Sequence, residues 1–298
     1  MSERAAILAA VLSSAFGGTA PAATRYVIGA TDPVTLAAFR FGVGFLLLLP
    51  VALALGQRWP RGRDWLGVAG LGTLFFAIFF VFYNAAFVYT TAARGALALS
   101  AMPLLTMAIA VLLGIEKLSA RKGAGVGIAV GGVAVALASG LGEAPPGAWR
   151  GDLIMAGGAV CMALYNVWSR PFIARSSALG FLTAGMGIGA ACLVAIAWVR
   201  GGFGAALEFG APQWTAVASL GLFASALSFY LWVFALERTT PTRVANTITV
   251  NPVTAALLAV PLLGESIGLN LVLGLVAVCA GIWIASTPGA TRSHPTLV

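Results

Sequence analysis

The sequence has very few charged residues. Only 9% of its 298 residues are Asp, Glu, Lys or Arg, against about a quarter in an ordinary soluble domain, whereas 60% are apolar. This number of polar side chains is too small to cover the surface of a soluble protein of 30.3 kDa. The part of the surface that is apolar must therefore face lipid. The composition therefore excludes a water-soluble globular fold and predicts an all-α integral membrane protein.

Residues that carry catalysis or bind metals are also scarce. The single histidine, His294, stands near the end of the sequence, and the three cysteines show no CxxC spacing. There is no GxxxxGK motif for ATP hydrolysis, and no cluster of His, Asp or Glu falls at membrane depth. We therefore expect no enzyme activity, no metal and no cofactor.

Ten apolar runs are long enough to cross a bilayer as helices of about 17 to 25 residues. Only short loops separate them, so no soluble domain is expected. The first run is interpreted as a membrane span rather than a cleaved signal, because its removal would leave nine helices and break the repeat described below. The predicted spans are 5–24, 33–55, 65–88, 95–114, 123–140, 153–173, 178–199, 213–236, 244–263 and 268–286.

The basic residues predict an orientation for these spans. The formal net charge is +8, but Lys and Arg stand singly or in groups of two or three between apolar runs, as topology-setting residues do. With the N-terminus inside, twelve of the 17 fall on the inner side, Arg40 lies within a span, and the outer side holds Arg25, Arg94, Arg150 and Arg200. This bias predicts cytoplasmic termini and gives no reason to expect a nucleic-acid partner.

The two halves of the sequence repeat each other. A shift of 149 residues, half the length, keeps register without a gap for more than sixty residues and pairs Thr90 with Thr239, Arg94 with Arg243, Pro103 with Pro252 and Glu116 with Glu265. We predict one five-helix repeat over residues 1–140, a second over 150–287 and a cytoplasmic tail over 288–298. Five is an odd number, so the second repeat must insert upside down. Inverted repeats are typical of secondary transporters that rock around a central site; a passive channel and an intramembrane enzyme are the alternatives.

The repeated motifs resemble a known family. The stretch from Tyr83 to Ala96, then Pro103, Leu113 to Leu118 and a glycine-rich fifth span, is similar to the EamA domain of the drug/metabolite transporter superfamily, and the second copy is similar over Phe234–Glu237, Thr239–Ala245, Asn251–Pro252 and Leu263–Glu265. The resemblance covers nearly the whole chain. It implies ten helices, both termini inside, and export or exchange of small metabolites across the cell (inner) membrane.

Within this family the chain most resembles the YddG-type branch, which implies an exporter of aromatic and other neutral amino acids. Export of other metabolites or of cationic drugs is the alternative, because the quoted motifs identify the fold and cavity residues choose the substrate. The partners expected are therefore a small-molecule substrate and the lipid bilayer, with the chain a monomer or a homodimer.

Helices that are interrupted near the membrane midplane are candidate substrate sites, because their backbone N–H and C=O groups lose their partners within the helix and can contact a substrate. Pro103 and Pro252 each free the carbonyl four residues earlier, that of Leu99 and that of Ile248. Gly17 interrupts the first span, and Ser100 and Thr249 occupy equivalent positions in the two repeats. The alternative is ordinary packing, since glycine and proline are common in membrane helices.

Amide and aromatic side chains form a second candidate set, because an unpartnered amide in hydrocarbon is costly and should face the bundle interior. Residues 225, 228, 229 and 232 share a helix face, as do 162, 165, 166 and 169. Such a cavity suits a small zwitterion with an apolar side chain; the alternative is hydrogen bonding between helices. The candidates are Tyr83, Asn84, Tyr165, Asn166, Trp168, Ser228, Trp232, Asn246, Thr249 and Asn251.

Two further features, an arginine within a span and a series of glycines, each have two interpretations. Arg40 could bind a substrate carboxylate, or have a structural role by snorkelling or by holding the carbonyls of a neighbouring helix; the resemblance favours the structural role. Gly123, Gly127 and Gly131 form a ladder that permits close helix packing, paralleled by Gly274 and Gly281 in the last span, either inside the monomer or at a dimer face.

Overall fold

The structure is a bundle of helices, with no strand in the residues that it describes. It is a computed structural model that describes residues 3–90, 99, 102–116, 119–137, 147–251, 253–255 and 269–286. The first half contains α1 (Glu3–Gly17), α2 (Ala20–Ile28), α3 (Pro33–Ala54), α4 (Asp64–Gly72), η1 (Thr73–Phe79), α5 (Phe80–Tyr89), α7 (Met102–Leu112) and α8 (Ala120–Leu137). The second contains α9 (Ala148–Trp168), α10 (Arg170–Arg175), α11 (Ala178–Val199), η3 (Gly202–Glu208), α12 (Ala211–Gly221), η4 (Leu222–Leu227), α13 (Ser228–Arg238), α14 (Pro241–Asn246), η5 (Thr247–Thr249) and α16 (Leu269–Ser286).

Helix α3 shows how the sequence sets a helix end. The Asp32 side chain accepts hydrogen bonds from the backbone N–H groups of Val34 and Thr35, and Pro33 occupies the first turn, where no N–H is needed. Burial favours the neutral carboxyl, but hydrogen bonds from the Thr35 hydroxyl and these N–H groups outweigh it and hold the pKa of Asp32 below its usual value. The cap thus fixes where α3 enters the bundle.

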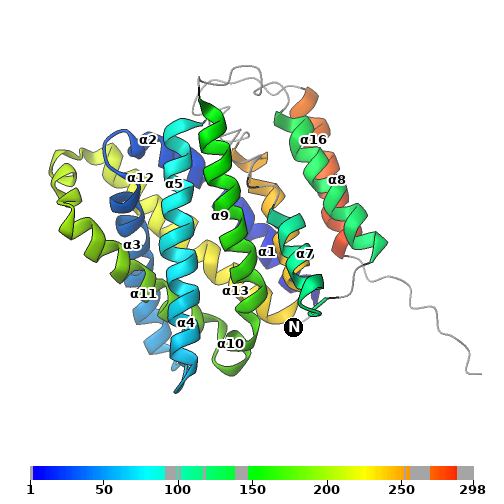
Figure 1. Cartoon of the computed structure of the whole chain (residues 1–298), viewed down its shortest axis with the longest axis horizontal. Helices are drawn as coiled ribbons and strands as arrows, with labels where there is room; N and C mark the ends of the chain where they lie inside the picture. The colour runs from blue at the N-terminus through cyan, green and yellow to red at the C-terminus, as the bar shows by residue number, and fades with distance from the viewer. Residues whose placement is uncertain are drawn as a thin grey trace, which may run out of the picture.

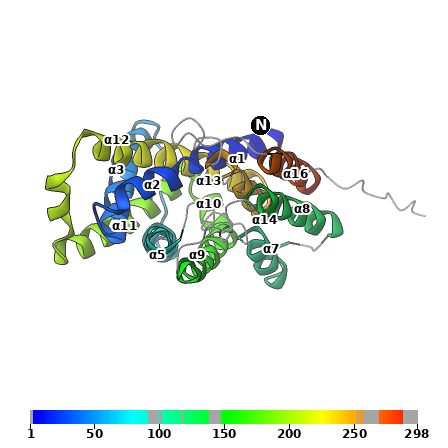
Figure 2. The same cartoon turned by 90° about the horizontal axis from the view of Figure 1, so that it is seen from above.

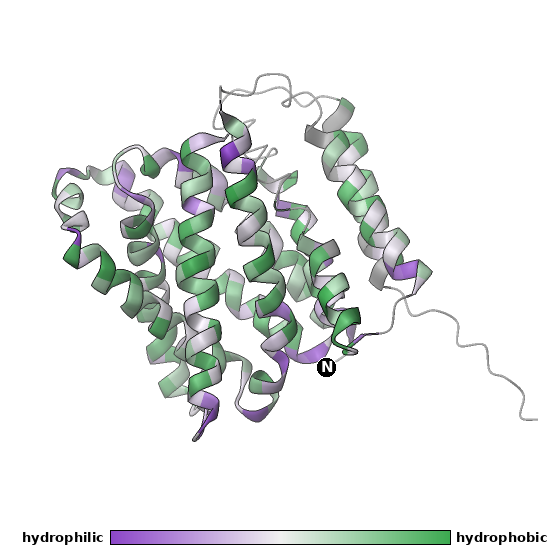
Figure 3. Ribbon diagram, viewed as in Figure 1, coloured by the Kyte–Doolittle hydropathy of each residue, from purple (hydrophilic) through white to green (hydrophobic). Residues whose placement is uncertain are grey.

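The long helices have the length and surface of membrane spans. Within the described residues, six are long and apolar enough to cross a bilayer: Glu3–Ile28, Pro33–Ala54, Asp64–Tyr89, Ala148–Arg175, Ala178–Val199 and Ala211–Arg238. Large apolar side chains point outward along them, including Leu66 and Trp198, which are 76% and 75% exposed. Figure 3 shows hydrophilic residues gathered mostly at the two ends of the bundle, with hydrophobic residues between them. This is the surface expected of a protein that lies in lipid.

Elements 149 residues apart make matched contacts. Helix α1 packs on α13. The helices at the equivalent positions in the other half, α9 and α5, also pack on each other. Two further pairs consist of equivalent helices that contact each other directly: α3 with α11, and α8 with α16. Figure 1 and Figure 2 both show α8 and α16 side by side at one end of the molecule and α3, α11 and α12 at the other. Each half of the chain therefore buries its apolar faces largely against the other half.

The third and eighth predicted spans share a local irregularity. Both contain a π-helical turn, η1 (Thr73–Phe79) and η4 (Leu222–Leu227), and the two turns begin 149 residues apart. A π-helical turn inserts an extra residue, loosens the i to i−4 hydrogen bonding and occurs often at functional sites. The space between η1 and η4 is therefore a candidate functional site.

The glycines that allow close packing of α8 and α16 differ from the predicted ladder. A Cβ on Gly132 would lie 2.7 Å from the Ala277 Cβ, and one on Gly281 would lie 2.5 Å from the Ala129 nitrogen. Gly123, Gly127 and Gly131 instead have nothing within 4 Å, because they lie on a face of α8 turned away from its neighbours in the described residues. Among the described residues the close contacts are therefore made by Gly281, as predicted, and by Gly132, whereas Gly123, Gly127 and Gly131 make none, so packing inside the monomer does not account for these three.

Candidate functional site

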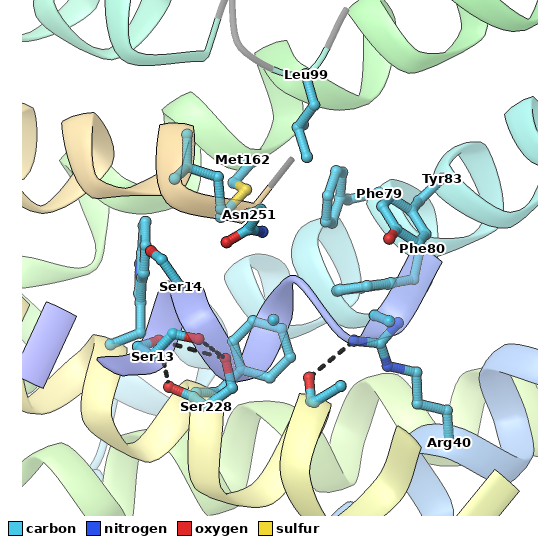
Figure 4. A pocket seen from close by; sticks show the side chains of 16 residues that line it. Ser13, Ser14, Arg40, Phe79, Phe80, Tyr83, Leu99, Met162, Ser228 and Asn251 are labelled. Carbon is cyan, nitrogen blue, oxygen red and sulfur yellow. Dashed lines mark hydrogen bonds between the residues drawn. The ribbon is translucent and has the colours of Figure 1, made fainter. Parts of the chain in front are cut away.

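A cavity of about 40 Å³ lies between the two halves of the chain. Both predicted repeats supply its wall, and the irregular segments η1, η4 and η5 each contribute to it. Figure 4 shows the side chains around it. The wall consists of Ser13, Ser14, Gly17, Ala20, Arg40, Phe79, Phe80, Tyr83, Leu99, Met162, Ala224, Ser228, Phe229, Trp232, Ile248 and Asn251.

The wall is built largely from pairs of residues at the 149-residue offset. Five such pairs line it, so ten of its residues occupy equivalent positions in the two repeats. Leu99 and Ile248 are one pair, the two residues whose carbonyls the prolines were predicted to free. The other pairs are Ser13 with Met162, Phe79 with Ser228, Phe80 with Phe229, and Tyr83 with Trp232. The cavity therefore lies where the pseudo-symmetric halves meet.

Helix α1 is tied across the cavity by hydroxyl groups. Ser13 Oγ donates to the Ser228 carbonyl (2.6 Å), and Ser228 Oγ donates to the Ser13 carbonyl (2.8 Å). At the next residue, Ser14 Oγ and Thr247 Oγ1 lie 2.9 Å apart in a hydrogen bond. These contacts connect the first predicted repeat to α13 and η5 of the second.

The first span is interrupted at its glycine pair. Helix α1 ends at Gly17 and α2 begins at Ala20. A Cβ on Gly17 would lie 3.2 Å from Asn251 Nδ2, and one on Gly18 would lie only 2.7 Å from both the Asn251 carbonyl oxygen and the Thr254 Cβ. The glycines thus let the end of α1 approach Asn251 closely.

Gly18→Ala is expected to lower transport at least tenfold and to lower the unfolding temperature, because the new methyl group must displace the backbone at Asn251. Gly42→Ala on α3 is the matched control, since a Cβ there has nothing within 4 Å. Initial rates and unfolding temperatures of both variants provide the measurement. Wild-type rates for Gly18→Ala would contradict the close approach.

Aromatic rings form the opposite part of the wall. Phe80 and Phe229 lie 5.7 Å apart between centroids in an edge-on arrangement, and Phe229 lies 5.2 Å from Phe75. Trp232 is fully buried, and its Nε1–H donates to Asn166 Oδ1 at 2.9 Å. Asn166 lies behind the wall and fixes the tilt of the indole ring.

Of the residues predicted from the sequence, Gly17, Arg40, Tyr83, Ser228, Trp232 and Asn251 line the cavity. Two others support it from behind: Asn166 through Trp232, and Tyr165 through its ring, which stacks on Phe75 at 4.2 Å. The two shared faces predicted on α9 and α13 thus come together.

Other predicted residues are placed elsewhere. Asn84 Nδ2 donates to the Pro33 carbonyl (2.9 Å), Thr249 Oγ1 donates to the Asn246 carbonyl of its own segment, and Asn246 is buried outside the wall. Trp168 is 45% exposed near the end of α9, and Pro103 is buried in the first turn of α7. Ser100 and Pro252 lie outside the described residues.

The sequence predictions missed Phe79, Phe80 and the α1 serines of the wall, and they placed position 229 on a candidate helix face without naming Phe229 as a site residue. Phe79, Phe80 and Phe229 sit among 17 phenylalanines, most of which face other core residues or lipid. A usable signal was present in the offset, because Phe80 pairs with Phe229 as Tyr83 pairs with Trp232. Ser13 and Ser14 lie four and three residues before Gly17, about one helical turn from the interruption that was predicted.

The geometry agrees with what similarity to known proteins shows. The profile of the EamA-like transporter family matches residues 4–138 and 149–287. The chain belongs to the EamA-like transporter family. This EamA protein is therefore a multi-pass protein of the cell membrane that moves a small-molecule substrate, and its family and relatives are transporters rather than enzymes.

Several proteins are similar to this EamA protein along most of its length. The "Uncharacterized transporter YyaM" of Bacillus subtilis is 26% identical over 92% of this chain and 90% of the relative. The "Probable terminal-alkyne amino-acid exporter" of Streptantibioticus cattleyicolor is 28% identical over 87% of this chain and 86% of the relative. A solved crystal structure with 26% sequence identity has a TM-score of 0.74 and covers 95% of this chain and 98% of its own.

Proposed function

We propose that this EamA protein is a secondary transporter that exports or exchanges small neutral metabolites, above all aromatic and large apolar amino acids, by alternating access. The observation that carries the proposal is the cavity lined by five pairs of residues at one fixed offset. A site between two pseudo-symmetric halves can face either side of the membrane when the halves rock. One relative is named as a probable amino-acid exporter, which supports the substrate class.

We further propose that residues 1–140 and 150–287 form two inverted five-helix repeats, giving ten spans with both termini in the cytoplasm. The matched packing of α1 on α13 and of α9 on α5 supports this arrangement, because a two-fold relation between the halves requires such equivalent contacts. The excess of Lys and Arg on one side supports the orientation. In the proposed map, residues 288–298 form a cytoplasmic tail.

The cavity has different chemistry on its two pseudo-symmetric sides, which supports an amphipathic substrate. Several polar side chains of the wall have an apolar counterpart at the offset, whereas Tyr83 and Trp232 pair two rings that each carry a polar atom. Two such pairs lie in the wall, Ser13 with Met162 and Ser228 with Phe79. The counterparts of Asn251 and Arg40, which are Met102 and Gly189, are not among its lining residues. The polar side chains of the wall suit the zwitterionic head group of an amino acid, and the apolar ones suit an apolar or aromatic side chain.

The size of the cavity supports the need for motion. About 40 Å³ has room for about three water molecules at about 10 to 15 Å³ each. Sites for larger ligands are usually about 300 to 1,000 Å³. An amino acid can therefore enter only when the walls move apart.

Equivalent polar contacts at the two ends of the bundle are candidate gates. Thr239 Oγ1 donates to Glu3 Oε1 (3.0 Å), and Thr90 Oγ1 donates to Asp152 Oδ1 (3.1 Å). Glu3 and Asp152 are 149 residues apart, as are Thr90 and Thr239. Figure 1 places the N-terminus at the bottom, and the end of α5 beside the start of α9 at the top. We propose that these contacts open alternately as each side becomes accessible.

Reconstituted liposomes provide the test of this function. Uptake of labelled L-phenylalanine and L-leucine is expected to saturate with concentration and to accelerate when unlabelled amino acid is loaded inside. Linear, non-saturating flux without this acceleration would favour a passive channel. Saturable flux of sugars or cationic drugs only would contradict the proposed substrate, and a proton gradient imposed across the membrane would report coupling.

A further inference from the structure

Arg40 places a positive charge inside a predicted membrane span. It is the eighth residue of α3, about 10 Å from the start of this helix at about 1.5 Å per residue. The residue is 2% exposed and forms part of the cavity wall. A guanidinium stays charged in proteins, so this charge is present at the cavity in every state of the transport cycle.

Two of the three guanidinium nitrogens hold the π-helical turn η4. Nε donates to Ser225 Oγ (2.9 Å), and Nη2 donates to the Ala224 carbonyl (2.8 Å). These bonds account for the structural role that the family resemblance favoured. The third nitrogen, Nη1, is buried and has no hydrogen-bond partner among the described residues. Anchoring η4 therefore leaves one charged donor unused.

The surroundings of Arg40 do not neutralise its charge. Arg40 takes part in none of the ion pairs formed by the residues that the structure describes. The guanidinium carbon instead lies over aromatic rings, 4.5 Å from the Phe80 centroid, 5.3 Å from Phe41 and 5.9 Å from Tyr83. Ring faces attract a cation more weakly than a carboxylate does, and they do not replace the missing hydrogen bond.

We propose that Arg40 binds the carboxylate of the substrate through Nη1, so that the transporter selects organic carboxylates. This deepens the function proposed above and rests on it. A carboxylate supplies both the opposite charge and the acceptor that Nη1 lacks. In the apo cavity the charge is stabilised by rings, by its interaction with the polar end of the Tyr83 side chain and by two bonds to η4, none of which is an anion. A bound carboxylate therefore improves the environment of Arg40 more than an uncharged group could.

A second unsatisfied group in the wall suits the other end of a zwitterion. Asn251 Oδ1 is buried without a hydrogen-bond partner among the described residues, and Asn251 lies on another part of the same cavity wall (Figure 4). An amide oxygen accepts a hydrogen bond from an ammonium group. Amines without a carboxylate would meet the unneutralised charge of Arg40, so cationic drugs are disfavoured as substrates.

Analogues that share one skeleton test the proposal on the wild-type protein. L-phenylalanine, 3-phenylpropionate, L-phenylalanine methyl ester and phenethylamine are compared as competitors of labelled L-phenylalanine uptake in liposomes, and as ligands that raise the unfolding temperature in detergent. We expect the two carboxylates to bind at least tenfold more tightly than the ester and the amine. Equal binding of acid and ester, or stabilisation by none of the carboxylates, would overturn the proposal.

Variants locate the preference at Arg40. In Arg40→Gln the acid-to-ester ratio should fall to near one, and Arg40→Lys should retain part of it; a purely structural role would change stability without changing this ratio. Arg150→Gln, which removes an exposed arginine on α9, is the control and should keep the wild-type ratio. An unchanged ratio in Arg40→Gln would overturn the assignment.

The two proposals fail in different ways. If carboxylates bind through Arg40 but no flux saturates, the transport proposal fails and the binding proposal stands. If amino-acid flux saturates while acid and ester compete equally, the binding proposal fails and the transport proposal stands. Because the analogue series needs no variant, misfolding of Arg40→Gln would still leave a decisive measurement.

Discussion

Replacing Trp232 by Ala is expected to reduce transport at low substrate concentration by at least tenfold. Trp232 is 1% exposed, lines the cavity and is held by its hydrogen bond to Asn166. Truncation of a buried aromatic residue removes about 3 to 5 kcal/mol of packing, part of which acts on the substrate and part on the fold. Transport rates over a range of concentrations, measured beside the unfolding temperature, separate these two parts.

Two variants sharpen this prediction. Trp232→Phe keeps a ring but loses the Nε1 donor, so it should show a smaller loss that resembles the loss in Asn166→Leu. Trp283→Ala is the matched control, because Trp283 is 69% exposed on α16 and absent from the cavity wall. Equal effects of Trp232→Ala and Trp283→Ala would mean that the cavity does not contact the substrate.

A disulfide between positions 13 and 228 is expected to stop exchange. Ser13 Oγ and Ser228 Oγ lie 3.3 Å apart, so cysteines at both positions should bridge with little adjustment. The two residues come from different halves of the chain, and the proposed rocking must separate or rotate them. Oxidation of Ser13→Cys/Ser228→Cys should lower exchange at least tenfold, and a reductant should restore it.

The background for this measurement lacks Cys161, Cys192 and Cys279, which are free in the structure. Each single-cysteine variant serves as a control and should respond to neither oxidant nor reductant. Full exchange by a protein shown to be cross-linked would contradict relative motion of α1 and α13 during transport.

The general fold could be predicted because its signals are strong in the sequence. Sparse charge predicts a membrane protein, and the all-helical, multi-pass architecture is confirmed. The resemblance to the EamA family is confirmed as well. The count of ten spans and the cytoplasmic termini stay predictions, since six spans meet the length and hydropathy criteria within the described residues.

The candidate site was predictable where a polar side-chain atom or, at Gly17, a helix interruption marked it. Tyr83, Ser228, Trp232 and Asn251 carry such atoms and line the cavity. Trp168 carries one too, but it lies two residues from Asn166, about 200° around the helix, and so points away from the neighbouring helix. Asn84 is used in a bond to Pro33 across helices, the alternative that was left open.

Other features depend on tertiary structure that local sequence does not reveal. The π-helical turns η1 and η4 shift the helix register by a residue and so decide which phenylalanines face inward. Gly132 rather than Gly131 packs on α16 because the partner helix sets the orientation of α8, although Gly131 is the residue that continues the four-residue spacing of Gly123 and Gly127. The unused donor of Arg40 likewise appears only when η4 is placed beside α3.

The central claim is that the substrate binds between the two halves, and a ligand with a heavy atom tests it most directly. 4-Iodo-L-phenylalanine, once shown to compete for uptake, is bound to the protein and its iodine located by anomalous diffraction. We expect an iodine peak among the rings of Tyr83, Phe229 and Trp232, with the carboxylate at Arg40 Nη1. A competing analogue whose iodine lies outside this cavity would contradict the account.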